Sequence, residues 1–389
     1  MDQDGVAERI DLGSRGRALE GEGDERVFVA TQWQLMWWKF RKHRLAIAGS
    51  IVLIVLYTTA IFADFLAPSD PNLFNKLYPY APPQRIRIFD ENGFQWPPYV
   101  YGLKRERDPV SLGVVFEMNK EVKYPLHFFV HSHPYKFWGL FETDLHLFGA
   151  KVDPQVLEET FFPLGSDRLG RDQLSRILYG TRISLSIGLI GMAISFFLGI
   201  LLGGVSGYYG GIADNLVQRV IEFLRSVPTT PLWMSLSAAL PPTWPPLRVY
   251  FGITIILSLI SWTGLARVVR SKFLSLREED FIMAAQLCGT NELRIIFRHL
   301  LPSFLSYIIA SLTLSIPGLI LSETSLSFIG LGLRPPTISW GVLMREAQNL
   351  IVVAKAPWLL IPGLLIVVTV LSFNFMGDGL RDAADPYVR

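Results

Sequence analysis

The chain has 389 residues, of which 50% are hydrophobic and only 18% are charged, and its formal net charge is +2. Soluble domains usually carry about 25% charged residues, so this composition argues against an ordinary soluble enzyme or binding module. The small net charge gives no reason to expect a nucleic-acid partner. We therefore expect a membrane protein whose first partner is the lipid bilayer.

Residues 1–26 are polar and glycine-rich, which predicts a disordered tail, and nothing at this end resembles a cleaved signal peptide. From Val27 to Trp38 the chain becomes amphipathic, with three tryptophans beside a basic cluster. This pattern fits an interfacial helix or an aromatic belt on the first span. Residues 1–44 are thus predicted to form a cytoplasmic tail followed by an interfacial helix.

Six long apolar runs without a charged residue follow along the chain. They cover residues 45–62, 183–208, 226–247, 249–266, 300–322 and 356–377. About 18 or more apolar residues span a bilayer as a helix, and one central Asp or Arg costs about 2.5 to 3.5 kcal/mol. The third run contains six prolines, so a shorter, broken or kinked span is expected there. The runs predict an all-α polytopic membrane protein with six transmembrane helices.

Basic residues lie immediately before the first span and between the fourth and fifth. Lys39, Arg41, Lys42 and Arg44 precede the first, and residues 268–298 contain five more Arg and Lys. By the positive-inside rule both groups are cytoplasmic, and the count of spans places the C-terminus there too. Cys288, the single cysteine, falls on this reducing side and forms no intrachain disulfide.

A first transmembrane helix over residues 45–67 is followed by an extracytoplasmic insert over residues 68–162. Short apolar runs bounded by Pro, Gly and Asn favour strands, so the insert is expected to be a mixed or β-rich domain. It holds four histidines, His127, His131, His133 and His146. A metal site is conceivable, but no Cys and no spaced acidic residues accompany them, so none is expected. Residues 163–389 then form a core with five transmembrane helices.

The most informative stretch is LSLREEDFIMAAQLCGTNELRIIFRHLLP, which runs from Leu274 to Pro302 inside a cytoplasmic segment over residues 268–302. On a helix, Ala285 and Gly289 lie four residues apart and share a face that another protein can approach closely. Pro302 suits the first turn of the next helix, where its missing N–H is not needed. The stretch predicts a short helix lying across the membrane plane and docking into a partner.

The same stretch resembles the signature of permease subunits of ATP-binding-cassette importers, E-A-A, three residues, G, nine residues, I-x-L-P. Matching positions are Ala284, Ala285, Gly289, Leu301 and Pro302. Met283 replaces the Glu of the signature and His299 replaces its Ile, as is common in the dipeptide and oligopeptide (peptide/nickel) branch. LAPSDP at residues 66–71, LGSDRLGRDQLSRILYG at 164–180, ETSLSFIGLG at 323–332 and GDGLRDAADP at 377–386 also resemble that branch. The resemblance covers residues 37–71 and 164 onward, and points to a C-type subunit.

The resemblance implies the type I importer permease fold and the inner or plasma membrane of a prokaryote. It further implies a heterodimer with a second permease subunit, two ATPase subunits and an extracytoplasmic substrate-binding protein. The sequence has no G-x-x-x-x-G-K-[ST] phosphate loop, so ATP and Mg would be bound by the ATPase subunits, and no cofactor or catalytic residue is expected here. Contact with the ATPases is assigned to Asp280, Ala284, Ala285, Gly289, Leu301 and Pro302.

Peptide is the expected substrate, while nickel complexes, opines, oligosaccharides and an ATP-independent channel or carrier remain alternatives. No residue is assigned to substrate. Asp167 and Asp172 are expected to cap the second span, with contact to the binding protein as the alternative. Glu323 is expected to face the pathway or to pair with a basic residue. Arg219, Glu222 and Arg225 are expected to form a salt bridge on one helix face.

Overall fold

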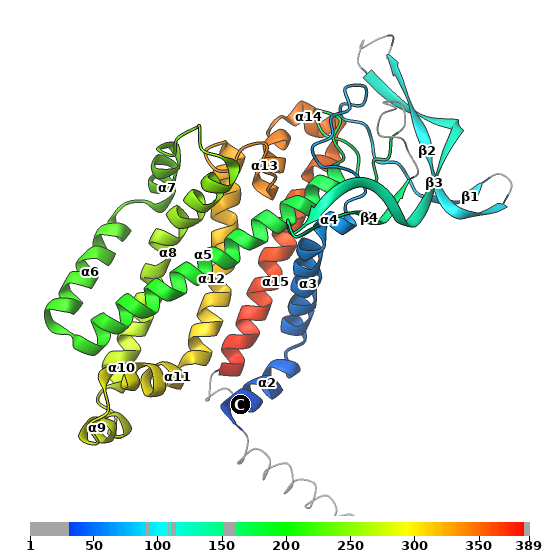
Figure 1. The fold of residues 1–389 in the computed structure, drawn as a ribbon. Helices are drawn as coiled ribbons and strands as arrows, with labels where there is room; N and C mark the ends of the chain where they lie inside the picture. The colour runs from blue at the N-terminus through cyan, green and yellow to red at the C-terminus, as the bar shows by residue number, and fades with distance from the viewer. Residues whose placement is uncertain (1–30, 91–92, 108, 110–113, 151–159, 385–389) are drawn as a thin grey trace, which may run out of the picture.

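The computed structural model describes residues 31–90, 93–107, 109, 114–150 and 160–384. These residues form a bundle of helices with a β-sheet at one end, called here the sheet end (Figure 1). The opposite end carries α2, α9, α10 and α11 and is called the α9 end. The predicted disordered tail lies outside the described residues.

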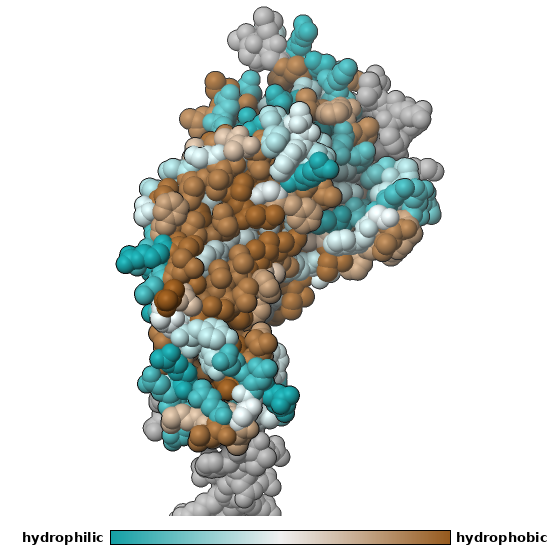
Figure 2. Space-filling model, turned by 60° about the vertical axis from the view of Figure 1, so that its left-hand side comes forward, coloured by the Kyte–Doolittle hydropathy of each residue, from teal (hydrophilic) through white to brown (hydrophobic). Residues whose placement is uncertain are grey.

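Within the described residues, five helical segments are long and apolar enough to cross a membrane. They are α3 (Arg44–Ile61), α5 (Gln173–Tyr209), α8 (Pro246–Leu276), α12 (Leu305–Ile329) and the segment Pro357–Ala384, which contains α15 (Ile361–Ala384). The shorter helices are α2 (Gln32–Lys42), α4 (Ala63–Leu66), α6 (Gly211–Ser226), α7 (Thr229–Ala238), α9 (Asp280–Leu287), α10 (Glu292–Ile295), α11 (Leu301–Ser303), α13 (Trp340–Met344) and α14 (Leu350–Lys355). Figure 2 shows a broad hydrophobic surface over the helices, bounded by hydrophilic residues toward both ends.

The third predicted span is divided rather than continuous. Helix α6 ends at Ser226, Pro228 precedes the ten residues of α7, and a proline-rich turn leads to α8 at Pro246. A proline inside a helix removes a hydrogen bond and clashes with the preceding turn, which accounts for the breaks. The described residues therefore contain five long apolar helices, and the run over 226–247 supplies only a short one.

Residues between α4 and α5 form a four-stranded antiparallel sheet in the order β1-β2-β3-β4. The strands are β1 (Arg87–Asp90), β2 (Gly93–Arg107), β3 (Val114–Phe137) and β4 (Phe141–Ala150). Register is set by pairs such as Tyr99 with Pro125 and Leu126 with Ala150. Val100, Leu126, Ala150 and Phe161 form a buried apolar cluster against the sheet. The four strands lie within residues 68–162, the insert that was expected to be mixed or β-rich beside an all-α bundle.

Helices α5 and α8 pack closely through glycines spaced by four. A Cβ atom on Gly203 would lie 2.5 Å from the carbonyl oxygen of Ala266, and one on Gly207 would lie 2.8 Å from that of Arg270. Gly199 similarly contacts Leu265. Small residues at this spacing let two helix backbones approach, which matters in a bilayer because lipid tails are as apolar as the helices.

Glu323 of α12 lies at the centre of a buried hydrogen-bond network that joins three helices at the sheet end. Its side chain is fully buried, and Oε1 accepts hydrogen bonds from Ser327 at 2.7 Å and from Ser339 at 2.8 Å. Ser184 of α5 donates to Oε2 at 3.5 Å and accepts from the backbone N–H of Trp340 in α13. Both expectations for Glu323 are therefore wrong, because the serine hydroxyls satisfy its carboxyl group inside the protein.

The glycine packing predicts that a Gly-to-Ala substitution has opposite effects on stability at two sites in the α5–α8 pair. Gly203→Ala should lower stability by about 1–3 kcal/mol, because its new methyl group overpacks the α5–α8 contact. Gly264→Ala on α8 should raise stability by up to about 1 kcal/mol, because nothing lies within 4 Å of that position and Ala favours a helix. Thermal unfolding in detergent compares them, and equal shifts would contradict the packing account.

The hydrogen-bond network of Glu323 predicts that stability depends more on the hydrogen bonds this side chain accepts than on its charge. Glu323→Ala should lose about 2 kcal/mol or more, because it leaves buried hydroxyl groups without their acceptor. Glu323→Gln keeps an oxygen at the Oε1 position and should lose much less. The same unfolding measurement decides: a Gln variant as unstable as the Ala variant would show that the charge itself is required.

Candidate functional site

The predicted coupling segment forms a set of short helices at the α9 end, between the spans α8 and α12 (Figure 1). Helix α8 ends at Leu276, and α9 begins at Asp280, whose carboxylate lies in the first turn where the helix dipole favours negative charge. The side chain of Asn291 caps α10 by accepting from the backbone N–H of Leu293 at 3.1 Å. Local capping thus divides the segment into two short helices.

Gly289 ends α9 rather than continuing its surface. The helix stops at Leu287, and Gly289 has φ +71°, a left-handed conformation that glycine adopts without strain. The backbone N–H of Thr290 then donates to the carbonyl oxygen of Ala285 at 3.1 Å, which closes the helix end. The expectation that Ala285 and Gly289 share one helix face is therefore wrong.

The inner and outer sides of α9 carry different residues. Ile282 is fully buried with Phe273 of α8, and Ala285 packs half-buried against the same core. Ala284 is exposed, as are the larger side chains Phe281 (46%), Met283 (44%) and Leu287 (90%). The outer side of α9 therefore offers another protein an apolar helix surface. The i, i+4 spacing of Met283 and Leu287 is the signal for this surface in the sequence.

The segment returns to α12 through an irregular helix. Ile296–Leu300 form a π-helical turn, and Leu301 and Pro302 follow in the short helix α11, just before α12 begins at Leu305. Pro302 thus opens a separate turn rather than α12 itself. Leu301 packs against the core that holds Ile282, so the segment is seated at both ends.

Polar contacts connect the predicted coupling segment and the neighbouring helix α6 to the spans. Tyr209, at the end of α5, donates to Oε2 of Glu292 in α10 at 2.8 Å. Arg270 of α8 contacts both carboxylate oxygens of Asp214 in α6 at 2.5 Å, and Ser206 of α5 donates to the same carboxylate. A displacement of α10 would therefore act on α5, which the Asp214 carboxylate joins to α8. On the neighbouring α6, Arg219 and Glu222 form the predicted salt bridge at 2.8 Å.

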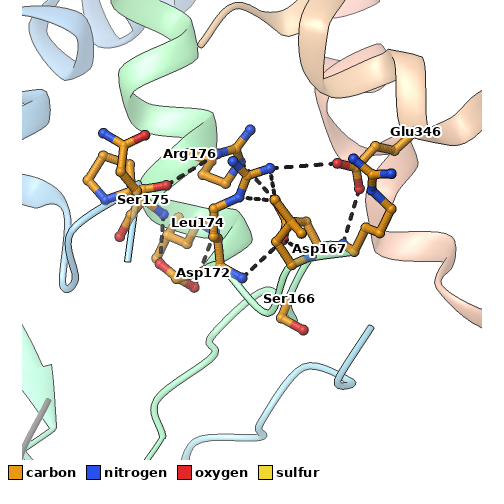
Figure 3. Close-up of polar contacts among 12 residues, drawn as sticks. Ser166, Asp167, Asp172, Leu174, Ser175, Arg176 and Glu346 are labelled. Carbon is orange, nitrogen blue, oxygen red and sulfur yellow. Dashed lines mark hydrogen bonds and ion pairs between the residues drawn. The ribbon is translucent and has the colours of Figure 1, made fainter. Parts of the chain in front are cut away.

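A second polar site lies at the sheet end, in the loop before α5 (Figure 3). Asp167 is buried and accepts from Nε of Arg171 at 2.6 Å, and Arg176 lies 3.2 Å from the same carboxylate. The carboxylate of Glu346 accepts from the backbone N–H of Arg168 at 3.2 Å and lies 3.7 Å from Arg171. Burial raises the pKa of Glu346. This network holds the loop against the segment that follows α13.

Asp172 caps α5, as expected. Its carboxylate accepts from the backbone N–H of Ser175 at 2.8 Å and from that of Leu174 at 3.4 Å. Burial raises the pKa of Asp172 to about 6, against the opposing effect of these hydrogen bonds. Asp167 was expected to cap the same helix, but its carboxylate instead pairs with Arg171 and Arg176, which the sequence did not predict.

A cavity of about 460 Å³ adjoins this network. Its lining includes Arg168, Arg171, Arg176, Arg345 and Glu346. Two of these arginines, Arg171 and Arg176, already pair with the carboxylate of Asp167. No metal-binding cluster of three or more His, Cys, Asp or Glu occurs within the described part of the chain. In the insert, His131 contacts Asp144, whereas His133 stacks on His146 at 4.3 Å.

Comparison with known families identifies two matches. Residues 196–389 match the binding-protein-dependent transport system inner membrane component, and residues 31–83 match the N-terminal TM domain of oligopeptide transport permease C. The chain is similar to methionine transporter MetNI in inward-facing crystal structures, with TM-score 0.41 and 19% identity, over 54% of this chain and 96% of that one.

Curated relatives agree with the family matches. The oligopeptide transport system permease protein OppC of Haemophilus influenzae is 40% identical over 63% of this chain and 75% of its own length. The dipeptide permease protein DppC of Bacillus subtilis is 37% identical over 58% and 68%. The glutathione permease protein GsiD of Pectobacterium atrosepticum is 38% identical over 58% and 73%. The chain therefore belongs to the family of binding-protein-dependent transport system inner membrane components.

Proposed function

We propose that this chain is a permease subunit of an ATP-driven importer that takes up peptides. The outer surface of α9 carries the proposal, because it presents large apolar side chains on a helix outside the spans and lies in the segment that matches the importer signature. Its relatives include permeases of oligopeptide, dipeptide and glutathione systems, which supports a peptide substrate. A nickel complex, opine or oligosaccharide is the alternative cargo.

The α9 end is proposed to face the cytoplasm and the sheet end the opposite side. Lys39, Arg41 and Lys42 lie in the last turn of α2, and Arg294 and Arg298 follow α9. Positive charge beside membrane spans favours the cytoplasmic side. With this orientation, both described ends of the chain, α2 and α15, are cytoplasmic.

A type I importer permease with six crossings remains the proposed architecture. Helices α6 and α7 follow one another alongside α8 and together would supply the third crossing (Figure 1). Helix α6 leaves Ile212, Leu216 and Phe223 exposed. We assign this surface to contact with lipid or with the second permease subunit of a heterodimer. The extracytoplasmic binding protein would dock at the sheet end.

Two ATPase subunits, which bind ATP and Mg, are proposed to act on the pair of permeases through their coupling segments. In this chain Met283, Ala284 and Leu287 would enter a groove of the ATPase, as an amphipathic helix enters an apolar groove. Asp280 and Gly289 would set the two ends of α9. Ala285, Leu301 and Pro302 would seat the segment against the spans.

The contact must carry enough free energy to reverse the orientation of the pathway. Shifting a two-state equilibrium from 1:99 to 99:1 takes about 5.5 kcal/mol of differential affinity. A rigid attachment of α9 to α8, through Ile282 and Phe273, suits this demand because little of the displacement would be lost within the protein. The proposed mechanism is therefore mechanical transmission from α9 to the spans.

A charge on the outer side of α9 should separate this chain from its ATPase. Leu287→Glu places a carboxylate in the proposed groove, and we expect ATPase co-purification and substrate-stimulated ATP hydrolysis to fall at least about tenfold, because burying an unpaired charge is costly. Leu287 is 90% exposed, so the chain itself should fold normally.

The matched control is Leu350→Glu. Leu350 is 83% exposed on α14 at the sheet end, so the same substitution there should leave ATPase co-purification unchanged. Equal co-purification of the two variants and the unaltered protein would remove α9 as the ATPase contact.

A further inference from the structure

The tip of the β3–β4 hairpin exposes a group of large apolar side chains. The tip spans residues 137–141, where Phe137 of β3 pairs with Phe141 of β4 across the turn. Trp138 is 54% exposed, Phe141 58% and Leu140 82%, and Phe129, earlier in β3, is 62% exposed. An apolar group of this size at one turn usually marks a contact with a protein or a membrane.

The tip lies level with the end of a candidate membrane span. The indole Nε1 of Trp138 donates a hydrogen bond to the backbone carbonyl oxygen of Ile61 at 3.1 Å. Ile61 is the last residue of α3, a helix long and apolar enough to cross the membrane. The bond therefore places the tip at the depth where α3 leaves the apolar part of the bilayer.

Aromatic contacts fix the hairpin beside this helix end. The rings of Phe137 and Phe62 are 6.0 Å apart, and those of Phe129 and Phe65 are 6.4 Å apart. The strands β3 and β4 also lie beside α4 in Figure 1. The position of the tip is therefore set by packing on the membrane-spanning part of the chain.

A charged residue of α5 completes the attachment. The guanidinium group of Arg182 lies 5.0 Å from the centre of the Trp138 ring. The same group donates to the carboxylate of Asp64 at 2.8 Å and to the carbonyl oxygen of Ala60 at 2.9 Å. Trp138 thus stacks on a cation of α5 whose hydrogen bonds reach α3 and α4, so the tip cannot shift without disturbing three helices.

The exposed surface of the tip continues the exposed surface of α3. Ile54 and Val55 of α3 are 65% and 57% exposed, and Ile61 and Phe62 at its end are 45% and 43% exposed. Because α3 is long and apolar enough to cross the bilayer, its exposed aliphatic side chains are suited to contact with lipid. The same surface then runs across Phe62 onto the hairpin.

We propose that the β3–β4 tip is a membrane anchor that inserts into the phospholipid leaflet at the sheet end. Trp138 and Phe141 would lie at the interface between headgroups and acyl chains, where aromatic side chains concentrate, and Leu140 would enter the acyl chains. The exposed ion pair between Lys136 and Glu142, next to the tip, would remain among the headgroups. The anchor would hold the sheet close to the membrane surface.

Lipid explains the geometry better than a protein partner. A protein covering the tip would also have to cover the end of α3, whose exposed side chains are continuous with the lipid-facing part of that helix. Lipid meets both surfaces at once and needs no separate binding site. The insert is thereby assigned a membrane contact that its strands alone would not indicate.

A nitroxide spin label on Leu140→Cys tests the anchor. The full chain, in a Cys288→Ala background with any co-purifying subunits, is placed in vesicles of phosphatidylethanolamine and phosphatidylglycerol. Oxygen concentrates in the acyl region and a neutral nickel chelate in water, so their collision rates with the label report depth. We expect the oxygen-to-nickel ratio at Leu140→Cys to be several-fold above that at the control.

The control is Val115→Cys, at the other end of β3, where the residue is 44% exposed and pairs with Glu106. Its label should collide mainly with the nickel chelate. The proposal fails if both labels favour nickel, if both favour oxygen, or if the label at Leu140→Cys is shielded from both reagents, which would indicate cover by a protein. Both sites are exposed, so neither substitution should prevent folding.

Discussion

The close contact between α5 and α8 is the constraint on which the rest of the structure depends. In a bilayer, the hydrophobic effect does not drive helices together, so their association requires close packing and satisfied polar groups. Gly203 and Gly207 allow the backbone of α5 to touch that of α8 at Ala266 and Arg270. Phe273 of α8 packs beside Gly204 and Gly207, and this ring also forms the core on which α9 rests. This one contact therefore sets the spacing of two spans and supports the segment that we propose to contact the ATPase.

Buried hydrogen bonds and ion pairs join the helices at both ends of the bundle. At the α9 end, Arg270, Asp214 and Ser206 connect three helices where the coupling segment leaves the spans. At the sheet end, the serines around Glu323 and the network of Asp167 with Arg171 join helices and loops through buried hydrogen bonds. Each satisfied buried group makes an alternative arrangement of its helices unfavourable, because separation would leave it without a partner. Such a structure can move as connected blocks, which suits alternating access to a pathway.

Sequence reasoning worked where the signal was local and failed where it depended on partners distant along the chain. Apolar runs located the long helices, and the capping role of Asp172 followed from its place before α5. The shared face of Ala285 and Gly289 was wrong because a helix was assumed to continue through a glycine that in fact ends it. Glu323 was misassigned because two serines that donate hydrogen bonds to its carboxylate, Ser184 and Ser339, lie on other elements. Residue spacing does not report such contacts. The sequence predicted that prolines would break the third run. It did not predict that this break would separate two helices, α6 and α7.

We propose that ATP hydrolysis acts on this chain through the outer surface of α9. Replacing Met283 with a photoreactive benzoyl-phenylalanine in the assembled transporter tests this directly, because the side chain is exposed and reacts only with groups in contact. Mass spectrometry of the cross-linked product identifies the neighbour. The account predicts a product between this chain and the ATPase subunit, whereas products only with lipid, the second permease or the binding protein would contradict it.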